Sequence, residues 1–129
     1  MRAVKLIHLS YFILIETTAE HIVQQNLDAY NARNIDAFLS SFAETIMLYS
    51  FGKNEPTAVG KAKVRAIYEQ LFVASPELHS SIKNRIVFDN KVIDHEYITG
   101  RLGLKKAIEM VLIYEVEGGK IARITAIKK

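Results

Sequence analysis

The sequence predicts a single domain of the α+β class. Segments with apolar residues at helical spacing occupy the first half of the chain, and strand-like segments joined by short turns fill the last third. Helices followed by strands favour an antiparallel sheet covered by helices over an alternating parallel-sheet fold. The length of 129 residues fits one domain, and 50% hydrophobic with 24% charged residues is typical of a globular protein.

Residues 1–16 differ from the rest of the chain. They are largely apolar after Arg2 and Lys5, but no small-residue cleavage site follows them, and the run is too short to span a bilayer. We expect an apolar N-terminal extension that packs on the domain or adds nothing to it; a poor export signal is the remaining alternative. The domain is expected to span residues 17–129, in a cytoplasmic protein with no membrane partner.

Three helices are predicted after this extension. The run Thr17–Glu20 fits a capping box, and the apolar residues of the first helix continue to Tyr30. Asn34 can cap a second helix. The third should begin near Val59–Gly60 and stop before Ser75–Pro76, because the residue before a proline avoids helical angles.

The predicted strands are one segment near the middle of the chain and two hairpins at its end. They are Ile46–Phe51, His79–Phe88, Val92–Thr99, Lys105–Val116 and Lys120–Ile127. Asp89–Asn90 is the expected two-residue turn of the first hairpin, and Glu117–Gly119 forms the turn of the second.

Composition and motifs exclude several kinds of site. The absence of cysteine excludes a disulfide framework, a thiolate zinc site, an iron–sulfur cluster and a cysteine nucleophile. The four histidines lack the spacing of a metal site, and the glycines form no phosphate-binding or dinucleotide-binding motif. The net charge of +3 comes from scattered basic residues. We therefore expect no metal, no cofactor and no nucleic-acid partner.

The first hairpin carries the main cluster of charged side chains. Counting outward from its turn pairs Arg85 with Asp94 and Lys83 with Glu96, and alternation places all four on one side of the sheet. The other side carries Ile82, Asn84, Ile86, Ile93, His95 and Tyr97.

Two orientations of this hairpin are open. Hydrophobicity alone turns the apolar side toward the core and leaves two surface ion pairs, each contributing less than about 1 kcal/mol. In the reverse orientation the carboxylates and the arginine lie in an apolar cavity. Their displaced pKa values would then suit acid, base or anion-binding roles.

The helical run Ile22–Ala43, with LDAYNARNIDAF at its centre, and the closing segment Ile113–Ile121 resemble SnoaL-like proteins. These belong to the nuclear transport factor 2-like superfamily, which includes ketosteroid isomerase. The order of helices and strands agrees over residues 18–127. The resemblance implies a cone-like roll, with three N-terminal helices packed on a strongly curved antiparallel sheet around a pocket. That scaffold hosts isomerases, cyclases, epoxide hydrolases, dehydratases and proteins that only bind or dimerise.

The resemblance also implies which positions face the pocket. The aspartate base of ketosteroid isomerase corresponds to Ser50, and its oxyanion-hole residues correspond to Asn26 and Leu112, so that residue set is absent. The Arg-x-Asp pair of limonene epoxide hydrolase is absent too, because Glu96 takes its first position. In these relatives the strand face of Asp94 and Glu96 looks into the cone, and the outer sheet face often mediates dimerisation.

Together these inferences define a candidate site. The candidate catalytic residues are Glu96, Asp94 and Arg85, with a carboxylate as proton acceptor or donor and the arginine as anchor for an anionic or carbonyl oxygen. Further candidates for ligand contact are Tyr49, Ser50, Leu112, Tyr114 and His95.

The expected function is a pocket for a small, partly apolar organic molecule. If the protein is an enzyme, we expect a cofactor-independent isomerase, cyclase or hydratase/dehydratase that uses carboxylate acid–base chemistry. The alternative is a non-catalytic ligand-binding or dimerisation module. In either case we expect a homodimer formed through the outer sheet face.

Overall fold

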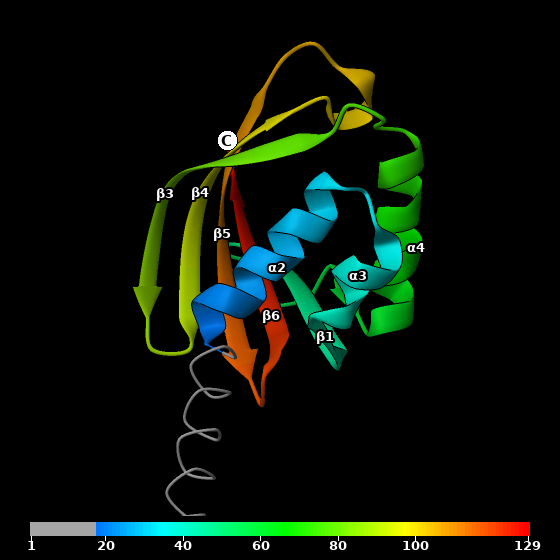
Figure 1. Ribbon diagram of the computed structural model, residues 1–129. Helices are drawn as coiled ribbons and strands as arrows, with labels where there is room; N and C mark the ends of the chain where they lie inside the picture. The colour runs from blue at the N-terminus through cyan, green and yellow to red at the C-terminus, as the bar shows by residue number, and fades with distance from the viewer. Residues whose placement is uncertain (1–17) are drawn as a thin grey trace, which may run out of the picture.

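The computed structural model describes residues 18–129, so the expected extension 1–16 lies outside the described residues (Figure 1). The helices of this part are α2 (Ala19–Asn31), α3 (Ile35–Ser40) and α4 (Lys61–Val73), with a short 3-10 turn η1 (Arg101–Gly103). The strands are β1 (Phe42–Ser50), β2 (Ala58–Val59), β3 (His79–Phe88), β4 (Lys91–Thr99), β5 (Ile108–Glu117) and β6 (Lys120–Lys128).

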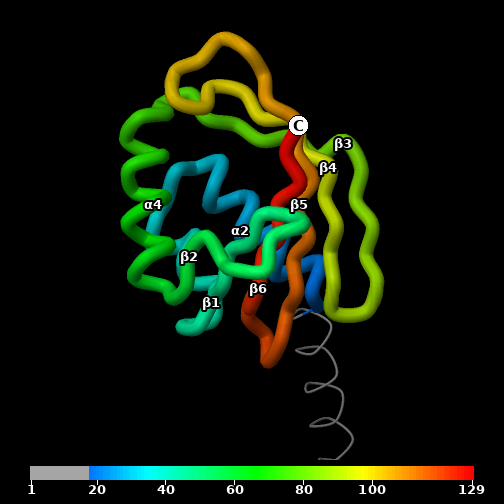
Figure 2. The backbone as a smooth tube through the Cα atoms, turned by 180° about the vertical axis from the view of Figure 1, so that it is seen from behind, coloured from blue at the N-terminus to red at the C-terminus, as the bar shows by residue number. Residues whose placement is uncertain are grey.

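The strands form one curved sheet in the order β2-β1-β6-β5-β4-β3, and the helices cover its concave side (Figures 1 and 2). The expected α+β roll is therefore confirmed. One detail differs, because β1 runs parallel to β6 while every other neighbouring pair is antiparallel. No hairpin connects β1 to β6, because β1 follows α3 in the chain. The connection therefore does not force these two strands to be antiparallel.

Local signals set the helix ends. Thr18 caps α2, and its Oγ1 accepts a hydrogen bond from the backbone N–H of His21 at 3.3 Å. Asn34 caps α3 as expected, with Oδ1 accepting from the N–H of Ala37 at 3.1 Å. No helix in residues 18–129 is both long enough and apolar enough to cross a membrane.

Aromatic side chains fill the space between the helices and the sheet. Five rings pack with centroids 4.6–6.4 Å apart, mostly in tilted or edge-to-face geometry. They belong to Tyr30, Phe38, Phe42, Tyr68 and Phe72. This cluster joins all three helices to β1 and forms one end of the core.

The β3–β4 hairpin turns at Asp89–Asn90, as predicted, and Arg85 faces Asp94. Further from the turn the register shifts between Ile82 and Asn84. A β-bulge of this kind adds one residue to one strand, so side chains beyond it change faces relative to a simple count.

The bulge overturns two predicted positions. Ile82, not Lys83, lies opposite Glu96, so the expected Lys83–Glu96 pair is wrong and Ile82 belongs to the inner face. Lys83 lies on the outer face instead. Its Nζ is 3.5 Å from Glu109 Oε1 and 5.3 Å from the centroid of the Tyr97 ring.

The hairpin takes the reverse of the orientation that hydrophobicity favours. Asp94 is 0% exposed and Glu96 is 3% exposed, whereas Ile86 is 54% exposed. The carboxylates of β4 thus lie inside the fold, as the family resemblance implies.

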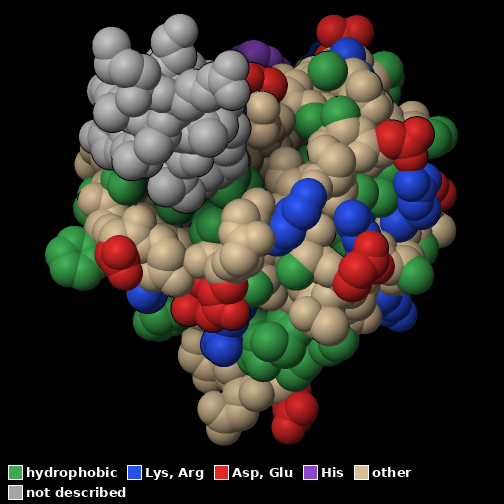
Figure 3. Space-filling view, turned by 60° about the horizontal axis from the view of Figure 1, so that its bottom comes forward, with side chains coloured by type: hydrophobic (Ala, Val, Ile, Leu, Met, Phe, Trp, Pro, Cys, Tyr) green, Lys and Arg blue, Asp and Glu red, His purple; other side chains and the backbone are tan. Residues whose placement is uncertain are grey.

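Positively and negatively charged side chains are interspersed on the face of the molecule drawn in Figure 3. On the face shown in Figure 3, Lys and Arg side chains mostly lie beside Asp and Glu side chains and do not gather into one basic patch.

Candidate functional site

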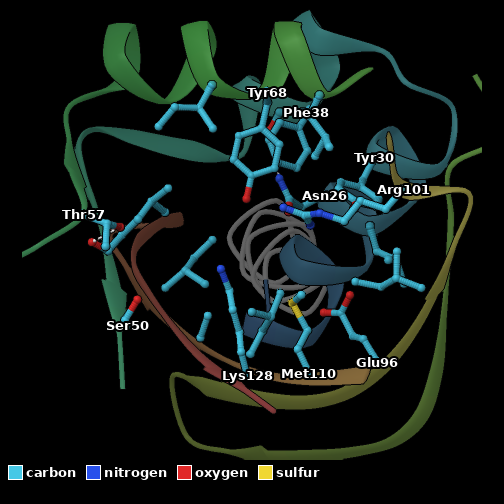
Figure 4. A pocket seen from close by; sticks show the side chains of 18 of the residues that line it. Asn26, Tyr30, Phe38, Ser50, Thr57, Tyr68, Glu96, Arg101, Met110 and Lys128 are labelled. Carbon is cyan, nitrogen blue, oxygen red and sulfur yellow. Dashed lines mark hydrogen bonds between the residues drawn. The ribbon is translucent and has the colours of Figure 1, made fainter. Parts of the chain in front are cut away.

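A cavity of about 560 Å³ lies between the helices and the concave face of the sheet (Figure 4). Its volume falls within the range of about 300–1,000 Å³ that is common for small-molecule sites. The wall is mainly apolar, and polar side chains enter it from several elements. These are Asn26, Tyr30, Tyr49, Ser50, Thr57, Tyr68, Gln70, Glu96, Arg101, Tyr114 and Lys128.

Glu96 is the acidic residue of the cavity wall. It lies on β4, and its carboxylate points into the cavity (Figure 4). Oε1 accepts a hydrogen bond from Ser80 Oγ at 2.7 Å, and Oε2 accepts from the Tyr114 hydroxyl at 3.3 Å. Two donors from the neighbouring strands β3 and β5 therefore hold this carboxyl group in place.

The surroundings of Glu96 favour its neutral form. Burial raises the pKa of the Glu96 carboxyl, and the negative charge of Asp94 acts in the same direction. The hydrogen bonds from Ser80 and Tyr114 and the charge of Arg85 oppose the rise without cancelling it. A carboxyl group with a raised pKa can both donate and accept a proton in the neutral pH range more readily than an ordinary glutamate.

Asp94, which is buried, and Arg85, which is partly buried, form an ion pair outside the cavity wall. Arg85 donates from Nε to Asp94 Oδ1 at 2.7 Å and from Nη2 to Asp94 Oδ2 at 2.9 Å. Its Nη1 also donates to Gln24 Oε1 at 2.8 Å. This bidentate pair ties the β3–β4 hairpin to α2, and neither partner is among the residues that line the cavity.

The arginine that reaches the cavity is Arg101, which sequence reasoning missed. It follows Gly100, which has a φ of +74° and stands so close to the backbone of Glu77 that a Cβ would collide with its carbonyl oxygen. The next residue, Leu102, donates its backbone N–H to Ser75 Oγ at 2.8 Å. These contacts fix the turn η1, and the guanidinium of Arg101 points into the cavity (Figure 4).

Four of the five residues predicted to contact a ligand line the cavity: Tyr49, Ser50, Leu112 and Tyr114. Tyr49 differs from the other three in having a cationic neighbour: its ring packs against the guanidinium of Arg123, with Cζ 3.8 Å from the ring centroid. Arg123 lies opposite Glu115 in the sheet.

His95, the fifth, lies on the opposite side of β4. Its Nε2 is 3.1 Å from Glu109 Oε2, on the outer face that also carries Lys83. Side chains alternate along a strand, so the neighbour of two inward carboxylates points outward. His95 is not part of the cavity wall.

The described residues offer no metal centre. Between residues 18 and 129, no group of three or more His, Cys, Asp or Glu side chains could hold a metal ion. The polar groups of the cavity are one carboxyl group, two cations, several hydroxyls and two amides, which can bind an organic ligand and move a proton.

Comparison with known proteins agrees with this architecture. An uncharacterised cystatin-fold protein from Novosphingobium aromaticivorans is 22% identical with a TM-score of 0.78, covering 86% of this chain and 98% of that one. An NTF2-like protein of unknown function from Cytophaga hutchinsonii is 17% identical with a TM-score of 0.71, covering 87% and 90%. An LEH-like epoxide hydrolase from M. tuberculosis is 13% identical with a TM-score of 0.74, covering 86% and 82%.

These identities are low, so the likenesses show the fold alone. No curated protein matches the chain. The model of the SnoaL-like domain matches residues 23–124, which is most of the described chain. The chain belongs to the SnoaL-like domain family.

Proposed function

We propose that the cavity binds a small, partly apolar organic molecule and that Glu96 transfers a proton to or from it. The observation that carries this proposal is the state of Glu96, which is almost fully buried, faces the cavity and has a raised pKa. Such a combination is common among acid–base residues of active sites. The fold is shared with an LEH-like epoxide hydrolase, which supports the proposal that a protein with this fold can be an enzyme.

The proposed reaction class is proton transfer next to a carbonyl group, or the addition or removal of water. The residue set of ketosteroid isomerase is absent: by the family resemblance, Ser50, Asn26 and Leu112 stand where that enzyme has its aspartate base, its tyrosine and its protonated aspartate. Here the carboxyl group comes from β4 instead, where Tyr114 and Ser80 orient it. Tyr114 stays a neutral donor, because burial holds the pKa of its phenol well above the usual value.

A cavity-blocking variant tests the proposal. Ala126 lines the cavity from β6, so Ala126→Phe is expected to fill part of it and to abolish binding of small ketones and esters. With the wild-type protein, one or more members of such a panel should raise Tm, and their α-protons should exchange with D₂O faster than in buffer, as followed by NMR. Ala66→Phe is the matched control, since Ala66 is exposed on α4 and does not line the cavity.

The outcome separates catalysis from binding alone. Ligands that raise Tm without any faster exchange would support the non-catalytic alternative, whereas a panel that neither binds nor exchanges would contradict both. Equal results with Ala126→Phe and the wild-type protein would show that the molecules act elsewhere on the surface.

The outer face of the sheet supports a second proposal, that the protein forms a homodimer through it. Alternation and register place a group of apolar side chains there: Ile86, Ile93, Tyr97, Val111, Ile113 and Ile127. Ile86 and Tyr97 are exposed in the single chain, and the rest are partly exposed. Exposed apolar side chains on one face of a sheet are common at interfaces between subunits.

We expect the wild-type protein to sediment as a dimer and Ile113→Glu to sediment as a monomer, because a charge at the centre of the interface would be buried without a partner. Val73→Glu is the control, since Val73 is exposed on α4, away from this face. A wild-type protein that sediments as a monomer at all concentrations would refute the interface.

A further inference from the structure

Two cationic side chains reach the cavity without a carboxylate partner. Arg101 enters from η1 and Lys128 from the end of β6, and both point inward (Figure 4). Among the salt bridges of residues 18–129, none involves either of them. Glu96, the cavity's carboxyl group, is bound by two hydroxyl donors and is shifted toward its neutral form. The cavity therefore carries an excess of positive charge.

Arg101 lies beside two tyrosines of the aromatic cluster. The Tyr30 hydroxyl is buried and lines the cavity; it makes no hydrogen bond of good geometry within the described residues, although the Arg101 guanidinium stands close enough to act on its pKa. Burial raises the pKa of the Tyr30 phenol, and the charge of Arg101 acts against that rise. The same two effects, in the same order, act on the pKa of Tyr68, whose hydroxyl points into the cavity (Figure 4). Arg101 is thus electrostatically coupled to both phenols.

An unpaired buried hydroxyl costs free energy, on the order of 1–3 kcal/mol. The guanidinium of Arg101 is partly withdrawn from bulk water without a carboxylate, which is also unfavourable. One acceptor group in the cavity, placed between Arg101 and Tyr30, would relieve both costs. A carboxylate suits this place best, because its two oxygens match the fork of donors on an arginine and one of them can also accept from a phenol.

We infer that the ligand is a monocarboxylate with an apolar body, whose carboxylate binds Arg101 and the Tyr30 hydroxyl at the η1 end of the cavity. This inference rests on the proposed function and names the chemical class of its ligand. The apolar body lies along the sheet wall, against Leu48, Leu112 and Ile124. Lys128, which is exposed at the end of β6, adds a second positive charge at the cavity wall.

The anion would also act on Glu96. A bound carboxylate in the same cavity disfavours a second negative charge, so it favours the protonated form of Glu96. The ligand would therefore place a proton donor beside its own apolar body, which suits the acid step of a water addition or removal.

Matched pairs of probes test the inference by calorimetry. Each pair contains an apolar carboxylate and its neutral amide: 2-naphthylacetate with 2-naphthylacetamide, 4-phenylbutyrate with its amide, and decanoate with decanamide. For at least one pair, the wild-type protein should bind the carboxylate about tenfold more tightly than the amide, or better. Arg101→Met should lose this preference and keep its affinity for the amide, whereas Arg101→Lys should keep part of it.

Arg65→Met is the matched control, because it removes an arginine from the exposed face of α4, where Arg65 pairs with Asp36 and Glu69. It should retain the preference of the wild-type protein. Tyr30→Phe should weaken carboxylate binding about threefold without changing amide binding.

The outcomes separate this inference from the proposed function. Equal binding of carboxylate and amide, or a preference that survives in Arg101→Met, overturns the carboxylate anchor and leaves the apolar cavity site standing. A protein that binds no member of any pair counts against both.

Discussion

Arg85→Met is expected to lower the free energy of unfolding by about 3–5 kcal/mol. The substitution removes the bidentate partner of Asp94, which is 0% exposed, and leaves a carboxylate buried without a counter-charge. It also removes the hydrogen bond from Arg85 to Gln24 that joins the hairpin to α2. Urea unfolding followed by circular dichroism measures the loss.

A double variant separates the cost of the unpaired charge from the value of the pair. Arg85→Met with Asp94→Leu should recover most of the lost stability, because apolar residues of similar volume commonly replace a buried ion pair at little cost. Lys83→Met is the control, since Lys83 is an exposed cation of the same strand, and it should change stability by less than about 0.5 kcal/mol. A small loss in Arg85→Met together with a large loss of ligand affinity would instead make this pair part of the binding site.

This result would assign different roles to three residues that the sequence groups together. Glu96, Asp94 and Arg85 all point to the inner side of the hairpin, but only Glu96 lines the cavity. Asp94 still acts on the site at a distance, because its negative charge contributes to the raised pKa of Glu96. Arg85 limits that effect by pairing with Asp94.

Local signals in the sequence predicted their structures well. The cap at Asn34 and the turn at Asp89–Asn90 depend on residues within three positions of one another, so a short window contains the whole cause. The pairing of Arg85 with Asp94 follows from that turn by counting. The first helix has a threonine cap, but the cap is Thr18, which bonds the N–H of His21, so the capping box expected over Thr17–Glu20 is shifted by one residue.

The orientation of the hairpin was harder to predict, because both of its sides carry apolar residues. Hydrophobicity favours the side of Ile86 and Ile93 as the inner one, but that side lies on the outer face of the sheet. Comparison with the family, rather than the residues alone, indicates the correct face. If the outer face binds a second subunit, as proposed above, its apolar side chains are buried in the dimer, and this would explain why the hydrophobic pattern favours the wrong face.

Two features could not be read from the sequence at all. No feature of the nearby sequence predicts the bulge at Lys83. The bulge nevertheless turns Ile82 to the inner face and brings Ser80 within hydrogen-bonding distance of Glu96. The place of Arg101 depends on contacts between η1 and the segment Ser75–Glu77, which are more than twenty residues away along the chain. Only Gly100, directly after a strand, hints at an unusual turn there.

Glu96→Gln is expected to reduce proton exchange of bound ligands by about 100-fold to about 10,000-fold, since glutamine keeps the shape of glutamate but cannot accept or release the proton. Ligand binding should change far less, because the walls of the cavity stay the same. The exchange rate per bound ligand, measured by NMR in D₂O, separates the two. Exchange that survives in Glu96→Gln would place the acid–base group elsewhere.

The same variant should become more stable than the wild-type protein at neutral and higher pH. In the unfolded chain Glu96 titrates near its ordinary pKa of 4.5, whereas burial raises the pKa in the folded protein. Between these two values the folded protein binds a proton that the unfolded chain has lost, so wild-type stability falls as the pH rises through this interval and then stays low.

Glutamine removes this dependence, because it carries no charge at any pH. The difference in Tm between Glu96→Gln and the wild-type protein should therefore be small near pH 4 and should grow toward about pH 8. Taking the difference removes the contributions of groups that do not interact with Glu96; Glu55→Gln, at an exposed position in the loop after β1, should show no such trend. A difference in Tm that does not change with pH would mean that water reaches the Glu96 carboxylate freely, and the case for its acid–base role would then lose its physical basis.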